Sequence, residues 1–148
     1  MDGERYSHTQ FGWWILVALD TAMVAIVLIA ALLHDFNPIV WTVLAILAFM
    51  EANFFCLTVK VNGEKLTLRF GVGLIRIVTS LSDIASVRAV TNPWYAGWGI
   101  RYMQDGWIYN VSGLRAVEVE LRSGSKLRVG TDQPERLEAV LKESRGVR

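Results

Sequence analysis

The chain has 148 residues, of which 53% are hydrophobic, and a formal net charge of +1 at pH 7. One cysteine excludes an intrachain disulfide and a cysteine-built zinc site, and two histidines are too few for most metal or acid–base sites. The small net charge combines two unlike parts, because residues 1–57 carry one basic and five acidic residues, whereas residues 58–148 carry fourteen basic and nine acidic residues.

Residues 13–33 form a long apolar segment, WWILVALDTAMVAIVLIAALL, which is interrupted only by Asp20 and Thr21. At ~1.5 Å per residue, a helix of this length crosses a hydrocarbon core of ~30 Å. A cleaved signal peptide is the alternative, but the apolar run is long, its start is not basic, and a second apolar segment follows directly. We therefore predict a retained membrane span.

The second apolar segment, residues 39–57, is slightly shorter and carries Glu51 near its end. The short link before it contains Asn37, which can cap a helix, and Pro38, which fits a first helical turn. The sequence thus predicts a second span that forms a tight antiparallel hairpin with the first. Together with an N-terminal tail, this hairpin is expected to make up residues 1–57.

The charges that flank the two spans predict the orientation of the hairpin. The link, HDFNP, has no Lys or Arg, and Arg5 precedes the first span. The second span is closely followed by four basic residues: Lys60, Lys65, Arg69 and Arg76. We expect a multi-pass protein of the cell (inner) membrane, with both termini and the C-terminal domain in the cytoplasm. The basic residues after the span also predict attraction to anionic lipid headgroups, at ~1 kcal/mol for each residue near the surface.

Asp20 and Glu51 are candidate polar contacts within the membrane. An antiparallel hairpin places them at similar depth on the cytoplasmic side of the midplane, where acidic residues are functional candidates. They would contact a second copy of this chain or an integral membrane partner, or handle protons; the alternative is a protonated or wetted side chain without a role. Two alanine stripes would allow close helix packing and would turn Asp20 outward: Ala18, Ala22 and Ala25, and Ala45, Ala48 and Ala52.

Beyond the second span the hydrophobic period changes from helical to alternating, so residues 58–148 are expected to form a cytoplasmic domain. One strand hairpin is predicted around the turn at 62–63 and another around the turn at 123–124, where Glu118 is expected to face solvent. About seven short strands precede a terminal amphipathic helix, whose apolar stripe is Leu137, Val140 and Leu141.

Residues 92–110 concentrate three tryptophans, three tyrosines and three glycines. Alternation predicts that Trp98 and Trp107 face the core of a small barrel. Trp94 and Tyr95 follow a proline turn without alternation, so they belong to a loop. Together with nearby Arg101, they are the candidate contact with a partner or with lipid headgroups.

Several segments between residues 55 and 143 carry a resemblance to a known family: LTVKVNGEKLTLRFG, SLSDIASV, NPWYAGWGIR, GWIYNVSG, AVEVEL and LRVGTDQPERLEAVL. In this order, with a terminal helix, they resemble the bacterial pleckstrin-homology-like (PH-like) domains of small membrane proteins with an N-terminal helical hairpin. The resemblance implies an α+β membrane protein whose seven-stranded, partly open β-barrel is capped by a C-terminal helix and serves binding rather than chemistry. Eukaryotic relatives bind phosphoinositides through basic residues on the first strand hairpin. Lys60, Lys65 and Arg69 lie there, although Lys65 and Arg69 are four residues apart rather than two.

No catalytic, cofactor or metal site is predicted. His8 and His34 flank the first span, so neither can reach a serine of the domain as a general base. The sequence predicts a non-enzymatic, membrane-anchored module for interaction or assembly, which binds a protein partner, itself or lipid headgroups, and not nucleic acid. Two alternatives are a subunit of a transport or proton-handling complex that uses Asp20 and Glu51, and a sensor that binds a small ligand at the barrel mouth.

A cysteine at Phe36 tests the predicted orientation. With Cys56 replaced, Phe36→Cys should react with a membrane-impermeant thiol reagent in intact cells, because the link between the spans is expected outside the cytoplasm. Ser144→Cys should react only after lysis. Labelling of Ser144→Cys in intact cells, with Phe36→Cys protected, would reverse the orientation.

Overall fold

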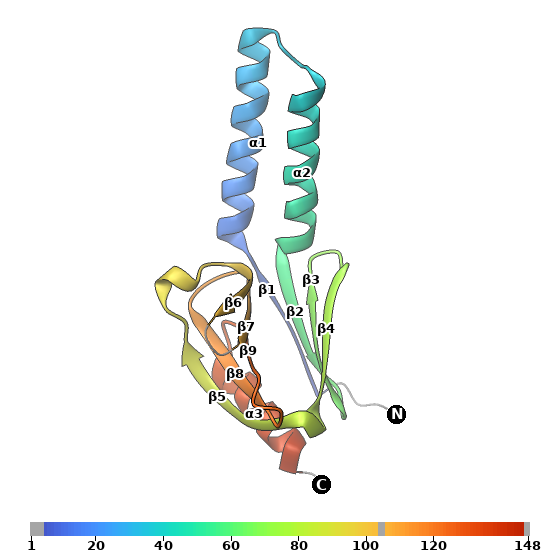
Figure 1. Ribbon diagram of the computed structural model, residues 1–148, viewed down its shortest axis with the longest axis vertical. Coiled ribbons are helices and arrows are strands. Elements are labelled where there is room, and N and C mark those ends of the chain that lie inside the picture. Colours follow the sequence, from blue (N-terminus) through green and yellow to red (C-terminus); the bar gives the residue numbers. More distant parts are fainter. Residues whose placement is uncertain (1–4, 104–105, 147–148) are drawn as a thin grey trace.

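The computed structural model describes residues 5–103 and 106–146, and over these residues the chain is an α+β protein with two sheets and three α-helices (Figure 1). Two long antiparallel helices project from one end of a β-rich domain. The helices are α1 (Trp13–Leu33), α2 (Pro38–Phe54) and α3 (Pro134–Gly146), and two 3₁₀ turns, η1 (Leu81–Asp83) and η2 (Trp94–Ala96), lie between strands.

The first sheet has the order β1-β2-β3-β4 and is antiparallel throughout. The second has the order β5-β8-β9-β7-β6, with β7 parallel to β9 and the other pairs antiparallel. The α+β class is confirmed. A seven-stranded barrel is not, because the described residues form nine strands in two sheets that do not join into a closed barrel. The strands are β1 (Tyr6–Phe11), β2 (Cys56–Val61), β3 (Lys65–Phe70), β4 (Ile75–Ser80), β5 (Ile84–Thr91), β6 (Gly99–Met103), β7 (Gly106–Asn110), β8 (Arg115–Leu121) and β9 (Lys126–Gly130).

Strand β1 occupies the segment in which the sequence predicts only a tail. It pairs with β2 along its whole length. The ladder then reaches the helices through a hydrogen bond from the Gly12 N–H to the Phe55 carbonyl oxygen (2.8 Å). Because the middle of this strand, SHTQ, is entirely polar, its alternation gives a weak hydrophobic signal. Helices α1 and α2 therefore begin and end on neighbouring strands of one sheet.

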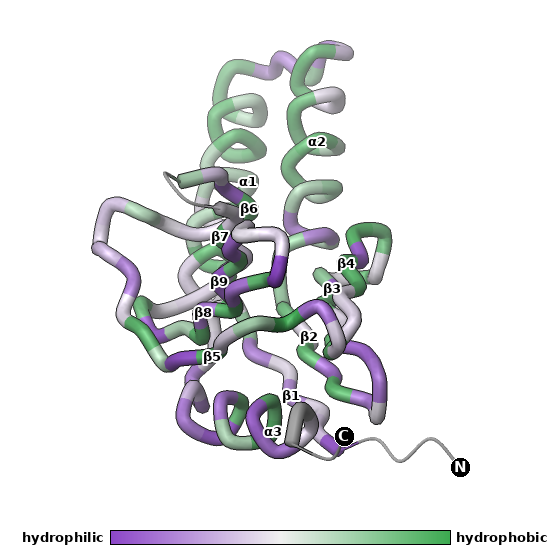
Figure 2. Tube along the Cα trace, turned by 60° about the horizontal axis from the view of Figure 1, so that its bottom comes forward, coloured by the Kyte–Doolittle hydropathy of each residue, from purple (hydrophilic) through white to green (hydrophobic). Residues whose placement is uncertain are grey.

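Helix α1 is long and apolar enough to cross a membrane, and Figure 2 shows that both helices are hydrophobic along most of their length. Helix α2 has 17 residues and ends at Phe54, three residues before the end of the predicted span, because β2 begins there. At its start, the Asn37 side chain accepts hydrogen bonds from two backbone N–H groups of the first turn (2.9 and 3.2 Å). The predicted cap is therefore confirmed, with Pro38 in the first turn.

The contact between α1 and α2 differs from the predicted alanine seam. On α2, the partly buried residues Val40, Leu44, Leu47 and Glu51 repeat at intervals of four and three, which is the spacing of a helix–helix contact. On the predicted stripes, Ala22 and Ala52 are partly buried, and the other four residues are exposed: Ala18, Ala25, Ala45 and Ala48. Larger side chains of α2 therefore fill the space between the helices.

The core lies between the two sheets. Alternate residues of β2 and β3 point inward and meet the inward residues of β8 and β9. Burial of each large apolar side chain contributes ~1.5–3 kcal/mol, so a shift in register by one residue would be costly. The largest fully buried side chains of these strands are Leu57, Val61, Leu66, Leu68, Phe70, Val117, Val119 and Val129.

Helix α3 links the outer strand of one sheet to the outer strand of the other. Arg136 lies over the Tyr6 ring of β1, 5.8 Å from the ring centre. Glu138 accepts a hydrogen bond from the Ala89 N–H of β5 (3.1 Å). The predicted apolar stripe of this helix is confirmed, because Leu137 and Leu141 are buried in the core and Val140 packs against it.

Gly71→Ala tests how closely the β3–β4 turn fits against α2. Gly71 has a φ of +44°, and a Cβ there would lie 2.1 Å from the Ala52 carbonyl oxygen. A Cβ at Gly63, in the β2–β3 turn, would meet nothing within 4 Å. In thermal melts of the full chain we expect Gly71→Ala to lower the free energy of unfolding by about 2 kcal/mol or more, and Gly63→Ala to change it by less than about 0.5 kcal/mol. Equal losses in the two variants would contradict this fit.

Candidate membrane-proximal binding surfaces

A loop with exposed aromatic side chains lies on the helix side of the domain, in the yellow segment of Figure 1. In η2, Trp94 and Tyr95 are 82% and 63% exposed, and their rings meet edge to face with centroids 6.0 Å apart. Pro93 precedes them with extended backbone. The structure places both residues on a loop, as the sequence predicts. Their contact with a partner or with lipid stays a prediction.

Arg101, in β6, is held against this loop by two contacts. Its Nε donates a hydrogen bond to the Trp98 carbonyl oxygen (3.3 Å). Its guanidinium also occupies the space beside Gly97, where a Cβ would lie 3.2 Å from the Arg101 Cζ. Because Gly97 has a φ of +65°, both the turn and this close approach favour glycine. The loop thus carries an exposed cation next to aromatic side chains.

Trp98 and Trp107 are not core residues, so the prediction that they pack inside a barrel is wrong. Their side chains are 40% and 47% exposed. Trp107 packs edge-on against Tyr102 of β6, with ring centroids 5.3 Å apart. Trp107 and Tyr109 do lie on the same face of β7, as the alternation predicts. Trp107, however, lies at the end of the second sheet beside its outer strand β6, where the first sheet does not cover that face. Tyr109, further along β7, is 9% exposed and does belong to the core.

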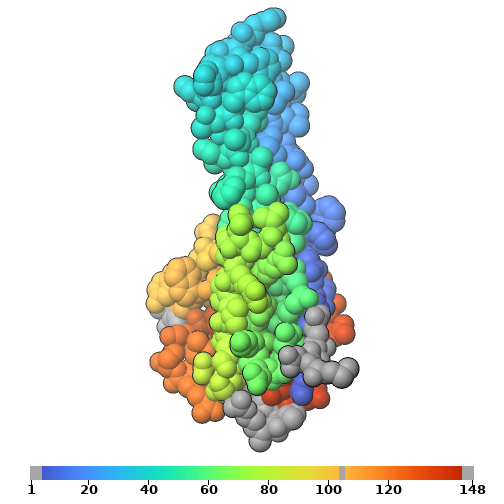
Figure 3. All heavy atoms as spheres, turned by 90° about the vertical axis from the view of Figure 1, so that its right-hand side faces the viewer, coloured from blue at the N-terminus to red at the C-terminus, as the bar shows by residue number. Residues whose placement is uncertain are grey.

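A hollow of about 600 Å³ on the outer face of the first sheet is lined by basic and hydroxyl side chains. Alternation along β2, β3 and β4 turns these side chains away from the core, and Figure 3 shows this outer face directly below the helices. Among the described residues, no acidic side chain lines the hollow. We call its polar residues the basic surface: Thr58, Lys60, Thr67, Arg69 and Arg76.

Arg69 and Arg76 lie directly opposite each other on β3 and β4. Like charges in such a cross-strand pair repel each other. Within the described part of the chain neither guanidinium has a carboxylate partner, and Arg69 instead donates a hydrogen bond to the Val72 carbonyl oxygen (3.1 Å). Two arginines at opposite positions of neighbouring strands, both lining the same exposed hollow, form a site that an anion would stabilise.

The basic surface stands close to the base of the helices. Arg69 is paired with Thr58, which follows the last residue of α2, Phe54, by four positions. At ~3.3 Å per residue, this places the pair within ~13 Å of the end of α2.

The structure brings together only part of the predicted basic site. Lys60 and Arg69 line the same hollow, whereas Lys65 lines a neighbouring one beside the β2–β3 turn. The sequence places Arg76 among the basic residues that follow the second span, but not in the predicted headgroup site. Its outward position in the alternating segment IRIVTS is the signal that could have identified it.

Asp20 and Glu51 occupy different environments. Asp20 is exposed on α1, whereas Glu51 is partly buried in the contact between α2 and α1. A contact of Asp20 with a second copy or with an integral membrane partner stays a prediction.

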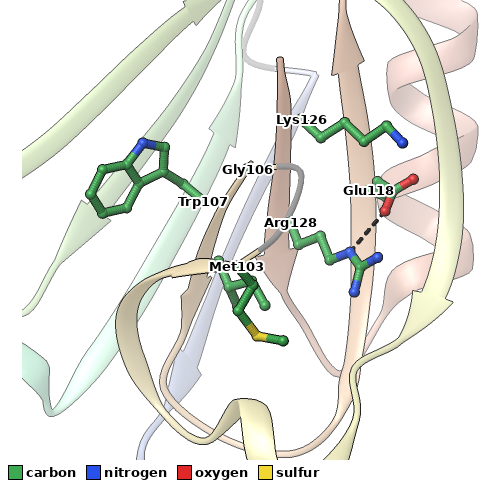
Figure 4. Close-up of a pocket in the computed structure, with 7 residues that line it drawn as sticks. Met103, Gly106, Trp107, Glu118, Lys126 and Arg128 are labelled. Carbon is green, nitrogen blue, oxygen red and sulfur yellow. Dashed lines mark hydrogen bonds and ion pairs between the residues drawn. The ribbon is translucent and has the colours of Figure 1, made fainter. Parts of the chain in front are cut away.

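Glu118 is buried on the outer face of the second sheet, although the sequence predicts that it faces solvent. The strand turns it outward as expected, but the arginines of the two neighbouring strands cover it and leave it 4% exposed. Its oxygens accept hydrogen bonds from Arg88 (2.6 and 2.9 Å) and Arg128 (2.8 Å). Figure 4 shows Glu118 with Arg128 beside a cavity of about 50 Å³, from which Trp107 points away. A cavity of this size accommodates water rather than a larger ligand.

The environment of Glu118 indicates a structural role. Burial raises the pKa of its carboxyl, but hydrogen bonds and charges from Arg128 and Arg88 outweigh this effect and hold the pKa below its ordinary value of 4.5. The carboxylate is thus ionised and fully paired at neutral pH. Across residues 5–103 and 106–146, no group of three His, Cys, Asp or Glu residues is arranged to hold a metal ion.

No protein-family model, curated protein or solved structure matches this chain. Its function is therefore inferred from the basic surface, from the aromatic loop formed by Trp94 and Tyr95 of η2, and from the position of both beside the helices.

Glu118→Gln should lower the free energy of unfolding at pH 7 by about 3 kcal/mol, because two guanidinium groups lose their shared carboxylate. The folded-state pKa of Glu118 lies below its unfolded value, so the stability that this carboxylate provides is present above about pH 4.5 and is lost as the pH falls through the folded-state pKa. In thermal melts, the difference between wild type and Glu118→Gln should therefore shrink as the pH falls below 4.5 and through the folded-state pKa. The exposed Glu143→Gln serves as control and should show little difference at any pH. A difference for Glu118→Gln that stays constant with pH would contradict the ionised network.

Proposed function

We propose that this chain is a non-enzymatic, membrane-anchored module of PH-like type, which binds anionic lipid headgroups at the cytoplasmic face of the membrane through its basic surface. The single observation that carries the proposal is the facing pair Arg69 and Arg76, without a carboxylate partner among the described residues and within ~13 Å of the end of a hydrophobic helix. Anionic phosphates are the abundant ligands at that distance from a bilayer core. A protein partner or a second copy is the competing occupant.

The strand pairing supports a hairpin that crosses the membrane twice. Phe11 and Cys56 are partners in the β1–β2 ladder, so both ends of the helical hairpin lie on the same side. If α1 crosses, α2 must cross back. Helix α2 has 17 residues, which at ~1.5 Å per residue span ~25 Å, at the short end of the range for membrane helices.

The flanking charges support a cytoplasmic position for the domain. Lys60, Lys65 and Arg69 follow α2, whereas the link between α1 and α2 has no Lys or Arg. Arg5 precedes α1 and adds to the positive charge on this side. The two chain ends themselves, residues 1–4 and 147–148, lie outside the described residues, so their cytoplasmic location stays a prediction.

The terminal helix supports the PH-like part of the proposal. Within the residues that the resemblance covers, eight strands, β2 to β9, are followed by α3, which is the C-terminal helix that the resemblance implies, with one strand more than it implies. The helical hairpin precedes these strands, as in the proteins that the chain resembles.

Photo-crosslinking tests headgroup binding with site resolution. The full chain is reconstituted in nanodiscs of phosphatidylcholine that contain some phosphatidylglycerol with a photoreactive headgroup, and crosslinked peptides are identified by mass spectrometry. We expect crosslinks within residues 65–80, and a yield about tenfold lower in Arg69→Gln with Arg76→Gln, because charge-assisted contacts are lost. High salt should reduce the wild-type yield by screening.

The double variant should fold at least as well as wild type, because it removes a like-charge pair, and thermal melts check this. Arg122→Gln is the matched control, since its backbone N–H bonds the Asp83 carbonyl oxygen at η1, remote from α1 and α2, and its crosslinks should be unchanged. An unchanged yield in the double variant, or crosslinks that avoid β3 and β4, would exclude headgroup binding at the basic surface.

A further inference from the structure

A second hollow lies between the helical hairpin and the second sheet, away from the basic surface. It has a volume of about 470 Å³, within the ~300–1,000 Å³ range of small-molecule sites. One wall consists of α1 and α2 side chains, and the other of the segment from η2 into β6. We call it the junction groove; the residues used below are Leu19, Met50, Trp98 and Arg101.

The helix wall of the junction groove is apolar and open to the surrounding lipid. Met50 on α2 is 46% exposed, and Leu19 on α1 lies six residues beyond the first residue of its helix. At ~1.5 Å per residue, the groove thus extends ~9 Å along α1 from the helix base. If the hairpin spans a bilayer, this upper part stands at the level of the lipid chains.

The domain wall of the groove is amphipathic. Trp98 is 40% exposed and presents a large ring, which suits the interface between lipid chains and headgroups. Arg101 supplies a guanidinium, and its hydrogen bond to the Trp98 carbonyl oxygen (3.3 Å) uses only one of its five N–H donors. Among the described residues, no carboxylate lines the groove.

We propose that the junction groove binds one anionic phospholipid, with an acyl chain against α1 and α2 and the phosphate on Arg101. Charge complementarity selects a phosphate for the guanidinium, and the apolar wall formed by the helices selects a chain for the rest of the groove. The occupant enters sideways from the bilayer, because Met50 is exposed on the lipid-facing side. This inference rests on the proposed membrane position of the hairpin and is independent of the basic surface.

Native mass spectrometry of the full chain in a mild nonionic detergent tests the proposal. Dioleoylphosphatidylglycerol, dioleoylphosphatidylcholine and chain-free glycerol 3-phosphate are titrated separately, and the affinity for the first bound molecule is compared. We expect the first phosphatidylglycerol to bind about tenfold more tightly than phosphatidylcholine, and glycerol 3-phosphate not to compete. Displacement of the lipid by glycerol 3-phosphate would overturn the acyl-chain part and leave a free-anion site.

Two substitutions separate the contributions of charge and shape. In the Arg69→Gln, Arg76→Gln background, in which the basic surface no longer attracts phosphatidylglycerol, Arg101→Gln should abolish the preference for this lipid, whereas Arg122→Gln should keep it. Met50→Trp should fill the groove and weaken binding of both lipids, whereas Phe49→Trp, at the adjacent position with 62% exposure, should bind like wild type. If the Met50→Trp variant does not fold, as judged by its thermal melt, Met50→Phe is the milder block. The proposal fails if Arg101→Gln retains the preference in that background, or if the position-50 variant binds lipid as Phe49→Trp does.

The basic-surface variant separates the two proposals. Arg69→Gln with Arg76→Gln should retain the first phosphatidylglycerol, and Arg101→Gln should retain the headgroup crosslinks on β3 and β4. Loss of the first lipid in the basic-surface variant would assign that lipid to the outer face of the first sheet and overturn the junction groove as its site.

Discussion

The pairing of β1 with β2 is the constraint on which the other features of this protein depend. It joins the two ends of the helical hairpin to adjacent strands and extends to the helix base through Gly12 and Phe55. The second sheet also reaches this point, because a Cβ on Gly12 would lie 3.0 Å from the Val111 carbonyl oxygen. The helices and the domain are thus connected by hydrogen-bonded backbone and close packing rather than by a flexible linker. The distances of the basic surface and of the aromatic loop from the base of the helices follow from this connection.

The outer faces of the two sheets differ in how their charged side chains are paired. Glu118 is enclosed by Arg88 and Arg128, which satisfies a carboxylate that burial would otherwise penalise. Arg69 and Arg76 face each other without such a partner in the described structure. A neighbouring carboxylate would stabilise the pair and would also neutralise the site. The repulsion is therefore a cost in stability that fits a surface which binds anions, whereas the paired network fits a surface that holds strands together.

The features that the sequence predicts well are those that depend on local pattern. The inward residues of β2, β3 and β8, the Asn37 cap and the Leu137 stripe all follow from alternation, helical period or capping chemistry. The errors occur where the outcome depends on distant segments. The central residues of β1 are all polar, and the segment forms a strand because it pairs with β2. Trp107 lies on the predicted face of its strand, but at a point that the first sheet does not cover. Glu118 is buried because arginines from the two neighbouring strands cover it. Of the candidate site, the aromatic loop and the basic residues Lys60 and Arg69 were predictable from the sequence. That Arg69 and Arg76 lie opposite each other could be known only from the register between β3 and β4.

The helical hairpin interrupts the first sheet in the chain order, and this has a consequence for biogenesis. The ribosome delivers β1 first, but its partner β2 emerges only after residues 12–55, when both helices have been made. Insertion that leaves the two helix ends on opposite sides of the bilayer would separate β1 from β2 permanently and leave β2 as an uncovered edge. If the hairpin spans a membrane as proposed, completion of the first sheet therefore requires that both helix ends lie on one side of it. Only chains inserted in this way would then acquire a complete domain.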